Sequence, residues 1–373
     1  NDVVAGEVWI CSGQSNMEWP VSRSNDAESE IAAADHPMIR LFTVAMTIAE
    51  KPSEQLGMPG HRHRTWKVCR PETIPSFSAV GYYFARHLHN RLNVPVGMIN
   101  SSWGGTLAEA WTRLEVLQDE PILRPIAERR SAVRVDENGH SIDDSKNPHR
   151  AAVLYNAMIA PLIPYRIKGA IWYQGESNVS RAWQYRTLFP TMIGNWREDW
   201  GQGDFPFYFT QLAPFNYGNT DPRCLAELWE AQFKTLSLPN TGMAVTVDIT
   251  DLDNIHPPNK QDVGKRLALW ALARDYAHLI VYSGPLYHSQ TIDDQRIRLH
   301  FKHTGGGLKT NNGAAPSHFQ IAGRDRHFID AEATIDGETV VLRADGINAP
   351  VAARYAWRQD ALPNLTNLAG LPA

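Results

Sequence analysis

Residues 6–20 of the chain read GEVWICSGQSNMEWP. Residues 8–11 form a short apolar run, as in a strand that is buried on both faces. Ser15 follows within a polar segment, so it is either the N-cap of a helix, a position that serine favours, or a nucleophile presented at the end of a sheet strand. The segment alone leaves both interpretations open. It differs from the Gly-x-Ser-x-Gly elbow of α/β-hydrolases, because Met17 occupies the last glycine position.

Strands of this kind alternate with helical patterns through roughly the first 280 residues. The other predicted strands are residues 94–100, 168–173, 207–212 and 243–248, several of them apolar on both faces. Residues 80–92 and 263–275 read as helices, and the clearest helix has one apolar face made of Tyr185, Leu188, Phe189, Met192, Ile193 and Trp196. This alternation predicts a doubly wound α/β/α fold around a mainly parallel sheet.

The pattern changes near Ser283, where segments with polar alternation begin. These predicted strands are residues 296–301, 318–322, 328–335, 338–344 and 352–357, and Asp336-Gly337 is a hairpin signal. We therefore divide the chain into a catalytic core, residues 1–282, and a β-rich C-terminal accessory region, residues 283–373, packed against or beside it. The charged stretch at 121–150 reads as a long surface excursion.

The composition narrows the class of protein. Of 373 residues, 43% are hydrophobic and 20% charged, as is usual for a globular protein, and the formal net charge of −4 gives no reason to expect nucleic acid or anionic lipid as a partner. No stretch approaches the 18 or so consecutive apolar residues of a membrane-spanning helix. The three widely spaced cysteines predict no disulfide framework and no metal site. The chain starts at Asn1 without a leader, so we expect it to be processed, trimmed or partial.

Two further segments stand where a predicted strand ends, the place where working residues gather in open parallel sheets. Gly104-Gly105 follows the strand at 94–100, and its bare N–H groups can point at an anion, although Gly-Gly is also ordinary turn chemistry. The turn at 172–178, WYQGESN, can complete an oxyanion hole with amide and hydroxyl groups. Alternatively, Glu176 and Asn178 merely satisfy the backbone of the loop.

The fourth segment, residues 251–258, reads DLDNIHPP. Asp253 lies three residues before His256, so its carboxylate can bend back onto Nδ1 and leave Nε2 free to take a proton from a serine. Asp251 is the less natural partner for the imidazole. A single histidine is more often structural, but the two prolines that follow it suit a base that must be held still.

The four segments together resemble the conserved blocks of a known family. They are GEVWICSGQSNM (6–17), GGTLAEAW (104–111), WYQGESN (172–178) and DNIHP (253–257). These blocks are similar to those of the sialate O-acetylesterase family within the SGNH hydrolases. The resemblance continues at residues 154–159, 264–268, 353–357 and 370–372, so it covers nearly the whole chain.

This resemblance implies an SGNH-type three-layer α/β/α sandwich and a carbohydrate acetylesterase. It makes Ser15 the nucleophile, His256 the base and Asp253 the residue that orients the base. It implies no cofactor and no metal. Proteins of this kind often carry an extra β-rich region ahead of the first strand; this chain starts almost on that strand, so we expect such a region to be absent, cleaved off or not included.

The resemblance also implies an oxyanion hole, built from the backbone N–H groups of Ser15 and Gly105 and one group from the turn at 174–178. The wider superfamily usually has Gly-x-Asn-Asp in that block, whereas this chain has Gly175-Glu-Ser-Asn178. We therefore favour the Gln174 side chain as the third donor. We expect three polar side chains to contact the substrate: Gln14, Glu176 and Asn178.

The predicted activity is removal of O-acetyl groups from sialic acids or related sugars, with an O-acetylated glycan as the partner. A bidentate arginine would suit the sialic acid carboxylate, and four are candidates: Arg150, Arg181, Arg223 and Arg354. Such substrates would suggest a periplasmic, secreted or lysosome-like location. The sequence leaves open the acetyl position and the oligomeric state.

Several other interpretations compete with this one. The same scaffold can serve acetylated plant polysaccharide such as acetylxylan, or a carbohydrate-binding homologue that has lost catalysis. A glycosidase would use Glu176 and Asp253 as paired carboxylates, but this leaves Ser15 and His256 idle.

His87 and His89 cannot share a metal on a helix, since positions i and i+2 point about 200° apart. His61-Arg-His63 reads as a solvated loop, and Gly305-Gly-Gly307 lacks the Lys-Ser/Thr of a phosphate loop.

Overall fold

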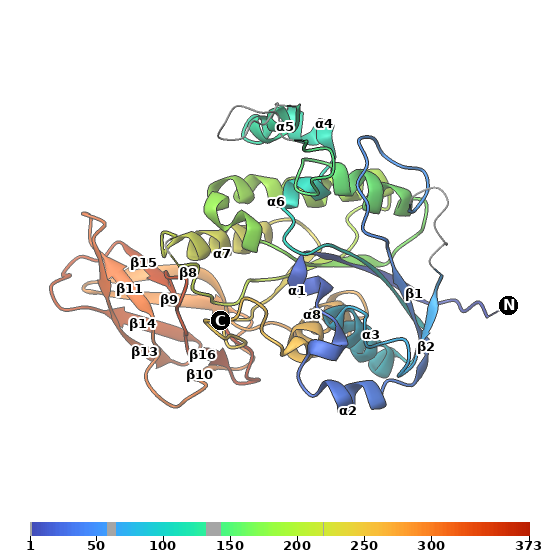
Figure 1. Cartoon of the computed structure of the whole chain (residues 1–373). Helices are drawn as coiled ribbons and strands as arrows, with labels where there is room; N and C mark the ends of the chain where they lie inside the picture. The colour runs from blue at the N-terminus through green and yellow to red at the C-terminus, as the bar shows by residue number, and fades with distance from the viewer. Residues whose placement is uncertain (1, 58–64, 132–142, 219) are drawn as a thin grey trace.

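The computed structural model describes residues 2–57, 65–131, 143–218 and 220–373. Its centre is a seven-stranded sheet with the strand order β3-β2-β4-β1-β5-β6-β7 (Figure 1). Six strands run parallel: β1 (Glu7–Gly13), β2 (His36–Thr43), β4 (Val96–Ser102), β5 (Gly169–Tyr173), β6 (Phe207–Thr210) and β7 (Thr241–Ala244). The short β3 (Lys67–Cys69) is an antiparallel edge strand. The mainly parallel sheet predicted from the apolar runs is confirmed.

Helices cover both faces of this sheet (Figure 1). One layer contains α3 (Ala79–Leu92) and α8 (Lys260–Arg274), and the other contains α6 (Ala182–Trp200) and α7 (Cys224–Thr235). All six residues of the apolar face predicted for α6 have 0% exposure, so the sequence identified the buried face of this helix. The α/β/α sandwich is thereby confirmed.

The part of the chain after α8 forms three antiparallel sheets (Figure 1). The largest has the order β13-β14-β9-β8, from β13 (Glu332–Asp336), β14 (Thr339–Arg343), β9 (Arg296–Lys302) and β8 (Leu286–Asp293). Gly337 turns between β13 and β14 at φ 62°, as the Asp-Gly signal predicts. The smaller sheets contain β10 (Leu308–Thr310), β11 (Phe319–Ala322), β12 (Phe328–Asp330), β15 (Ala352–Tyr355) and β16 (Leu365–Asn367).

These strands have a hydrophobic core of their own, which includes the fully buried Ile297, Ile321 and Val340. A much larger cluster packs the central sheet of the α/β/α sandwich against both helix layers. Among the described residues, no helix is long and apolar enough to cross a membrane.

The remaining helices are short. They are α1 (Ser15–Glu18), η1 (Val21–Arg23), α2 (Ala27–Ala32), η2 (Ala108–Trp111), α4 (Leu114–Asp119), α5 (Arg124–Ser131), the π-helix η3 (Tyr155–Ile159), η4 (Ala160–Leu162) and η5 (Glu176–Arg181). Part of the predicted excursion at 121–150 forms α5, while residues 132–142 lie outside the described residues, as do His61 and His63.

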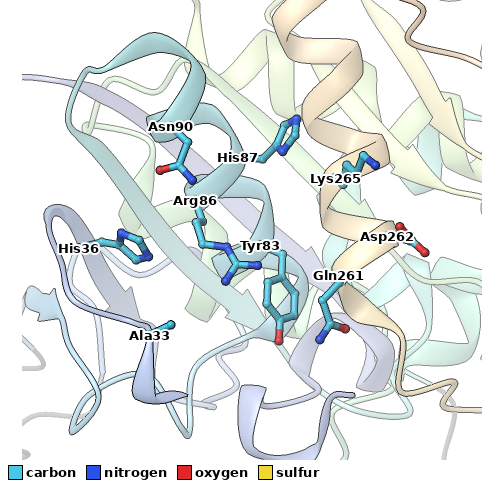
Figure 2. Close-up of a pocket in the computed structure, with 9 residues that line it drawn as sticks. All are labelled: Ala33, His36, Tyr83, Arg86, His87, Asn90, Gln261, Asp262 and Lys265. Atoms are coloured by element: carbon cyan, nitrogen blue, oxygen red, sulfur yellow. The ribbon is translucent and has the colours of Figure 1, made fainter. Parts of the chain in front are cut away.

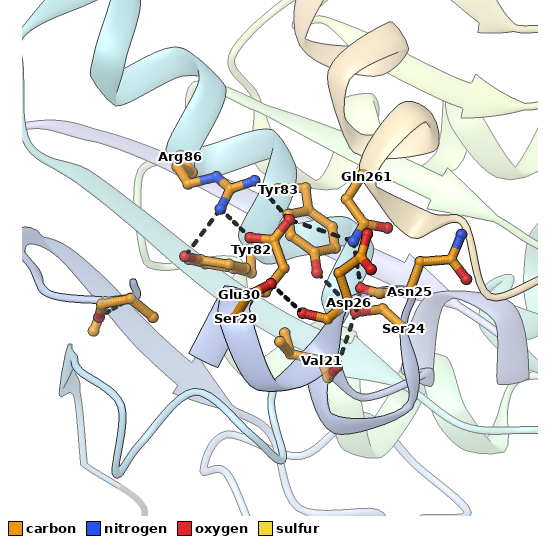
Figure 3. Close-up of polar contacts among 12 residues, drawn as sticks. Val21, Ser24, Asn25, Asp26, Ser29, Glu30, Tyr82, Tyr83, Arg86 and Gln261 are labelled. Atoms are coloured by element: carbon orange, nitrogen blue, oxygen red, sulfur yellow. Dashed lines mark hydrogen bonds and ion pairs between the residues drawn. The ribbon is translucent and has the colours of Figure 1, made fainter. Parts of the chain in front are cut away.

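A pocket of about 470 Å³ lies where α3 and α8 face the chain around α2 (Figure 2). His87 lines it from α3, whereas His89 Nδ1 contacts the carbonyl oxygen of Val94 at 2.8 Å. Polar contacts beside the pocket fasten α2 to the neighbouring helices, through an ion pair between Arg86 and Glu30 (Figure 3). Within the described ranges, no three or more His, Cys, Asp or Glu side chains gather as metal ligands would.

Candidate active site

Ser15 lies at the carboxyl end of β1, the central strand of the sheet. A glycine is required before it, because Gly13 has φ +136° and a Cβ there would lie 2.1 Å from the carbonyl oxygen of Tyr173. Ser15 is the first residue of α1, whose N-cap is Gln14 without a side-chain capping bond. The N-cap interpretation of Ser15 is therefore wrong, and its hydroxyl is not used to start the helix.

The structure brings His256 to Ser15 across 241 positions of sequence. His256 Nε2 lies 2.8 Å from Ser15 Oγ, a hydrogen-bond distance. The loop that carries His256 leads from β7 into α8, so both side chains meet at the carboxyl edge of the sheet. This pair can deprotonate the hydroxyl and attack an electrophile.

The imidazole is held by an aromatic neighbour from the nucleophile segment. The ring of Trp19 stacks on His256, with centroids 4.9 Å apart and planes inclined by 17°. Desolvation lowers the pKa of His256, and the nearby positive charges of Lys260 and Arg23 lower it further. The imidazole is therefore neutral at neutral pH, which is the form that accepts a proton from serine.

Asp253 occupies a different position from the one predicted for it. Its side chain is exposed, and neither a hydrogen bond nor an ion pair joins it to His256 among the described contacts. The N–H of Asp253 donates to Asp251 Oδ1 at 3.0 Å, and that of His256 donates to Asn254 Oδ1 at 2.9 Å. These two tight side-chain-to-backbone turns determine the path of the loop and leave the Asp253 carboxylate in solvent.

Asn16 connects the segments that carry the nucleophile and the base. Its Nδ2 donates to Glu176 Oε1 at 2.6 Å and to the carbonyl oxygen of Ile255 at 3.0 Å, and its Oδ1 accepts from Lys260 Nζ at 2.5 Å. Burial lowers the pKa of Lys260 to about 7 and raises that of Glu176. Sequence reasoning missed Asn16 and Lys260, although each lies within four residues of a predicted catalytic residue.

Two predicted oxyanion donors remain available for a substrate. Ser15 N is at the first position of a helix, where backbone N–H groups have no intrahelical acceptor. Gly105 is exposed, has φ +75°, and its N–H makes no hydrogen bond within the described structure. The neighbouring Gly104 N–H is already taken by Glu18 Oε2 at 2.6 Å.

The Gln174 side chain does not lie free as an oxyanion donor. It is fully buried, and its Nε2 donates to the carbonyl oxygen of Thr106 at 3.2 Å and to Asn178 Oδ1 at 2.7 Å. Both amide hydrogens are therefore used to hold the segment that follows Gly105. The prediction for Gln174 finds no support in this geometry, because neither amide hydrogen is left for a substrate oxygen.

The three predicted substrate-binding side chains also make contacts within the protein. Gln14 Oε1 accepts from Gly175 N at 3.2 Å, and Asn178 Nδ2 donates to Glu109 Oε2 at 2.9 Å. Glu176 bonds Asn16 through Oε1, while its buried Oε2 has no hydrogen-bond partner. The contacts of these three side chains lie within the protein. That they bind a sugar stays a prediction.

The four candidate arginines are engaged elsewhere. Arg150 pairs with Glu50, Arg181 with Glu109 and Arg223 with Asp221. Arg354 Nε donates to Gln320 Oε1 at 2.7 Å within the C-terminal sheets.

A large cleft is lined in part by the ends of β2 and β4. Its volume is about 1310 Å³, and Glu18, Asn100 and Ser102 are among the residues that line it. Glu18 links it to the nucleophile, since a Cβ on Gly104 would lie 3.1 Å from Glu18 Oε2 and 3.3 Å from Ser15 Cβ. Sequence reasoning missed this cleft, because the loop after β2 that forms one wall carries no motif.

Comparisons with known proteins identify the family of this chain. A family model described as carbohydrate esterase, sialic acid-specific acetylesterase, matches residues 5–273. The chain is 34% identical to rat sialate O-acetylesterase, over 77% of this chain and 60% of that protein, and 35% identical to the human one, over 77% and 57%. It thus spans about 60% of the length of the rat relative and slightly less of the human one.

A solved structure is also similar over nearly the whole chain. The crystal structure of a carbohydrate acetylesterase from Xanthomonas citri has a TM-score of 0.87 and 38% identity, and the match covers 98% of this chain and 79% of that one.

Proposed function

Since the chain belongs to the sialic acid-specific acetylesterase family of carbohydrate esterases, we propose that it is a serine esterase that removes O-acetyl groups from sugars. The observation that carries the proposal is the 2.8 Å contact between His256 Nε2 and Ser15 Oγ beside two unused N–H groups. A nucleophile, a base and oxyanion donors at one strand end are the parts that acyl transfer requires.

The reaction follows from this geometry in two halves. His256 Nε2 takes the proton of Ser15 as Oγ bonds to the acetyl carbonyl carbon, and the N–H groups of Ser15 and Gly105 stabilise the resulting oxyanion. The tetrahedral intermediate collapses, and His256 gives its proton to the departing sugar oxygen. Water, deprotonated by the same imidazole, then attacks the acetyl-serine, and as the second tetrahedral intermediate collapses the imidazolium returns the proton to Ser15 Oγ and acetate leaves.

The orientation of the base has two possible sources. Asp253 as the orienting carboxylate remains a prediction from the resemblance. Within the described geometry, Trp19 stacks on the imidazole and Asn16 holds the loop at Ile255, so the base has support without a carboxylate. We therefore propose Ser15 and His256 as the catalytic pair, with Asp253 outside the reacting centre.

The substrate class follows from the family at a coarse level. The rat and human relatives are named sialate O-acetylesterases, so O-acetylated sialic acids or related sugars are the first expectation, and an acetylated polysaccharide such as acetylxylan is the second. A periplasmic, secreted or lysosome-like location would suit such glycans.

The division into a catalytic core, residues 1–282, and an accessory region, residues 283–373, also remains a proposal.

The test is acetate release by the purified chain from 9-O-acetylated sialoside and from acetylated xylan, with Ser15→Ala as the control. We expect release from at least one substrate and a loss of at least about 10³-fold in the variant, as for other nucleophile deletions. Release that survives in Ser15→Ala would overturn the assignment of the nucleophile. A protein that binds these sugars but releases no acetate would be a carbohydrate-binding homologue.

A further inference from the structure

The N–H proposed as an oxyanion donor belongs to a peptide between two glycines, Gly104 and Gly105. The carbonyl group of Gly104 and the N–H of Gly105, which are the two polar groups of this peptide, make no hydrogen bond among the described residues. Glycine has no Cβ and adopts a wider range of backbone angles than other residues. Nothing within the Gly-Gly unit itself therefore holds the donor in place.

Glycine is needed at both positions for the donor to lie beside the nucleophile. Gly105 has φ +75°, in the left-handed region that favours glycine. A Cβ on Gly104 would lie 3.1 Å from Glu18 Oε2 and 3.3 Å from Ser15 Cβ, so a side chain here would push the loop away from the nucleophile. The close approach therefore depends on two residues that leave the backbone free to move.

Side chains from two other segments fasten the backbone on either side of the donor peptide. The N–H of Gly104 donates to Glu18 Oε2 at 2.6 Å. The carbonyl oxygen of Gly105 accepts a hydrogen bond from Ser177 Oγ at 2.7 Å. Each bond fixes one of the two peptide planes that flank the donor peptide, so the Cα atoms at both of its ends are held.

Both fastenings lead back to the segment that carries the nucleophile. Glu18 is the last residue of α1, and Ser15 is the first. The N–H of Ser177 lies 3.4 Å from Gln14 Oε1, which also accepts the N–H of Gly175 at 3.2 Å. Since Gln14 directly precedes Ser15, the position of the donor is set relative to the nucleophile from two sides.

We propose that Ser177 and Glu18 are positioning residues that hold the N–H of Gly105 where the oxyanion forms. The inference rests on the proposed esterase function and adds the two side chains that place its oxyanion donor. Neither side chain contacts the reacting atoms in this role, since each acts through the backbone of the glycine pair. Fixed donors stabilise an oxyanion because they need no reorganisation at the moment of reaction.

A direct role for the Ser177 hydroxyl is the rival interpretation. Ser177 stands where the wider superfamily usually has the asparagine of Gly-x-Asn-Asp, so its hydroxyl could itself donate to the oxyanion. A hydroxyl has one hydrogen to donate, and here the carbonyl oxygen of Gly105 receives it. Glu18 separates the two interpretations, because a carboxylate cannot donate to an oxyanion, and its loss matters only if the donor peptide must be held.

The experiment compares an aryl acetate with its thiono analogue, in which sulfur replaces the carbonyl oxygen. Sulfur is a weak hydrogen-bond acceptor, so the ratio of the two kcat/KM values measures how much the reaction depends on the oxyanion donors. We expect Ser177→Ala and Glu18→Ala each to lower kcat/KM for the aryl acetate by about tenfold, less than the 10²- to 10³-fold that removal of a donor costs. The preference for oxygen over sulfur should fall by a similar factor.

Conservative and control variants distinguish positioning from a general loss of structure. Ser177→Thr keeps the hydroxyl and Glu18→Gln keeps an acceptor oxygen, so both should retain kcat/KM and the oxygen preference within about threefold. Ser180→Ala removes an exposed hydroxyl from the same η5, and Glu28→Ala removes an exposed carboxylate from α2. Both controls should stay within about twofold of wild type.

The outcomes separate this inference from the proposed function. An active wild-type enzyme with an equally active Ser177→Ala variant would overturn the inference and leave the esterase function standing. A fall in kcat/KM without a fall in the oxygen preference, or a fall that Ser177→Thr shares, would also overturn it. So would an unchanged Glu18→Ala beside a slow Ser177→Ala, and if Glu18→Ala does not fold, the half-buried Ser177 carries the test. No hydrolysis of the aryl acetate, the 9-O-acetylated sialoside or acetylated xylan by the wild type would overturn the proposed function itself.

Discussion

Lys260 Nζ donates a hydrogen bond of 2.5 Å to Asn16 Oδ1 at a place where Lys260 has no exposed surface. This bond orients the amide of Asn16, so that its Nδ2 points to Glu176 Oε1 and to the carbonyl oxygen of Ile255. The residue after the proposed nucleophile is thereby joined to the residue before the proposed base. The buried amine positions the base through Asn16, besides lowering the pKa of His256 by its charge, and no hydrogen bond joins it to Ser15 or His256 among the described contacts.

Replacing Asn16 by Ala should lower kcat by about 10- to 100-fold with a smaller change in KM, because misplacing a catalytic group by about 1 Å has an effect of this size. The variant also leaves the Lys260 amine and the Glu176 carboxyl group buried without their shared partner, so the free energy of unfolding should fall by about 2–4 kcal/mol. Steady-state kinetics on an aryl acetate and urea unfolding measure the two effects. Asn90→Ala, at an exposed position of α3, is the matched control. A raised KM with unchanged kcat would show that Asn16 contacts the substrate instead.

Replacing Lys260 by Met should alter the dependence of stability on pH. Burial lowers the pKa of Lys260 from 10.5 to about 7, so between these values the unfolded chain binds a proton that the folded chain does not. The contribution of this side chain to stability therefore rises with pH across that window, by at most about 1.4 kcal/mol per pH unit. Urea unfolding at pH 7 and pH 9 should show wild type gaining stability relative to Lys260→Met. Parallel pH dependences in the two proteins would contradict the buried, neutralised amine.

Asp253→Asn decides between the resemblance and the geometry. The exposed carboxylate has no hydrogen bond to His256, so we expect kcat to fall by less than about tenfold, whereas loss of a true orienting aspartate lowers kcat by about 10⁴-fold. Kinetics on the same aryl acetate measure the difference, with Asp251→Asn as the neighbouring control. A loss near the larger figure would establish Asp253 as the orienter and show that the loop rearranges during turnover.

The pH profile of kcat/KM should reflect the surroundings of His256. Desolvation and the positive charges of Lys260 and Arg23 lower its pKa below the ordinary 6.5, so the acid limb should have its midpoint below that value. Activity rises with pH through this limb because the neutral imidazole is the base. Arg23→Gln removes one of the positive neighbours and should move the midpoint upwards. A wild-type midpoint above 6.5 would contradict a desolvated imidazole.

The sequence alone determined the layers of the core, because local periodicity follows directly from burial. The strand at 8–11 and the apolar face at 185–196 became β1 and the buried face of α6, since each pattern can bury its apolar side in only one kind of element. Strand β2 was missed, because its pattern of partly exposed residues contains no continuous apolar run. Parallel strands also placed Ser15 and His256 at the same edge of the sheet before any distance was known.

Only the tertiary structure decided which polar groups are free. Gln174 and Asn178 have the chemistry of oxyanion and sugar ligands, yet both are used to hold the segment after Gly105. Lys260 would be assigned to solvent on its residue type, but it is fully buried, and Asn16, 244 positions away, accepts a hydrogen bond from its amine. Periodicity is local and can be read along the chain. The choice of a hydrogen-bond partner depends on distances between segments that only the folded chain brings together.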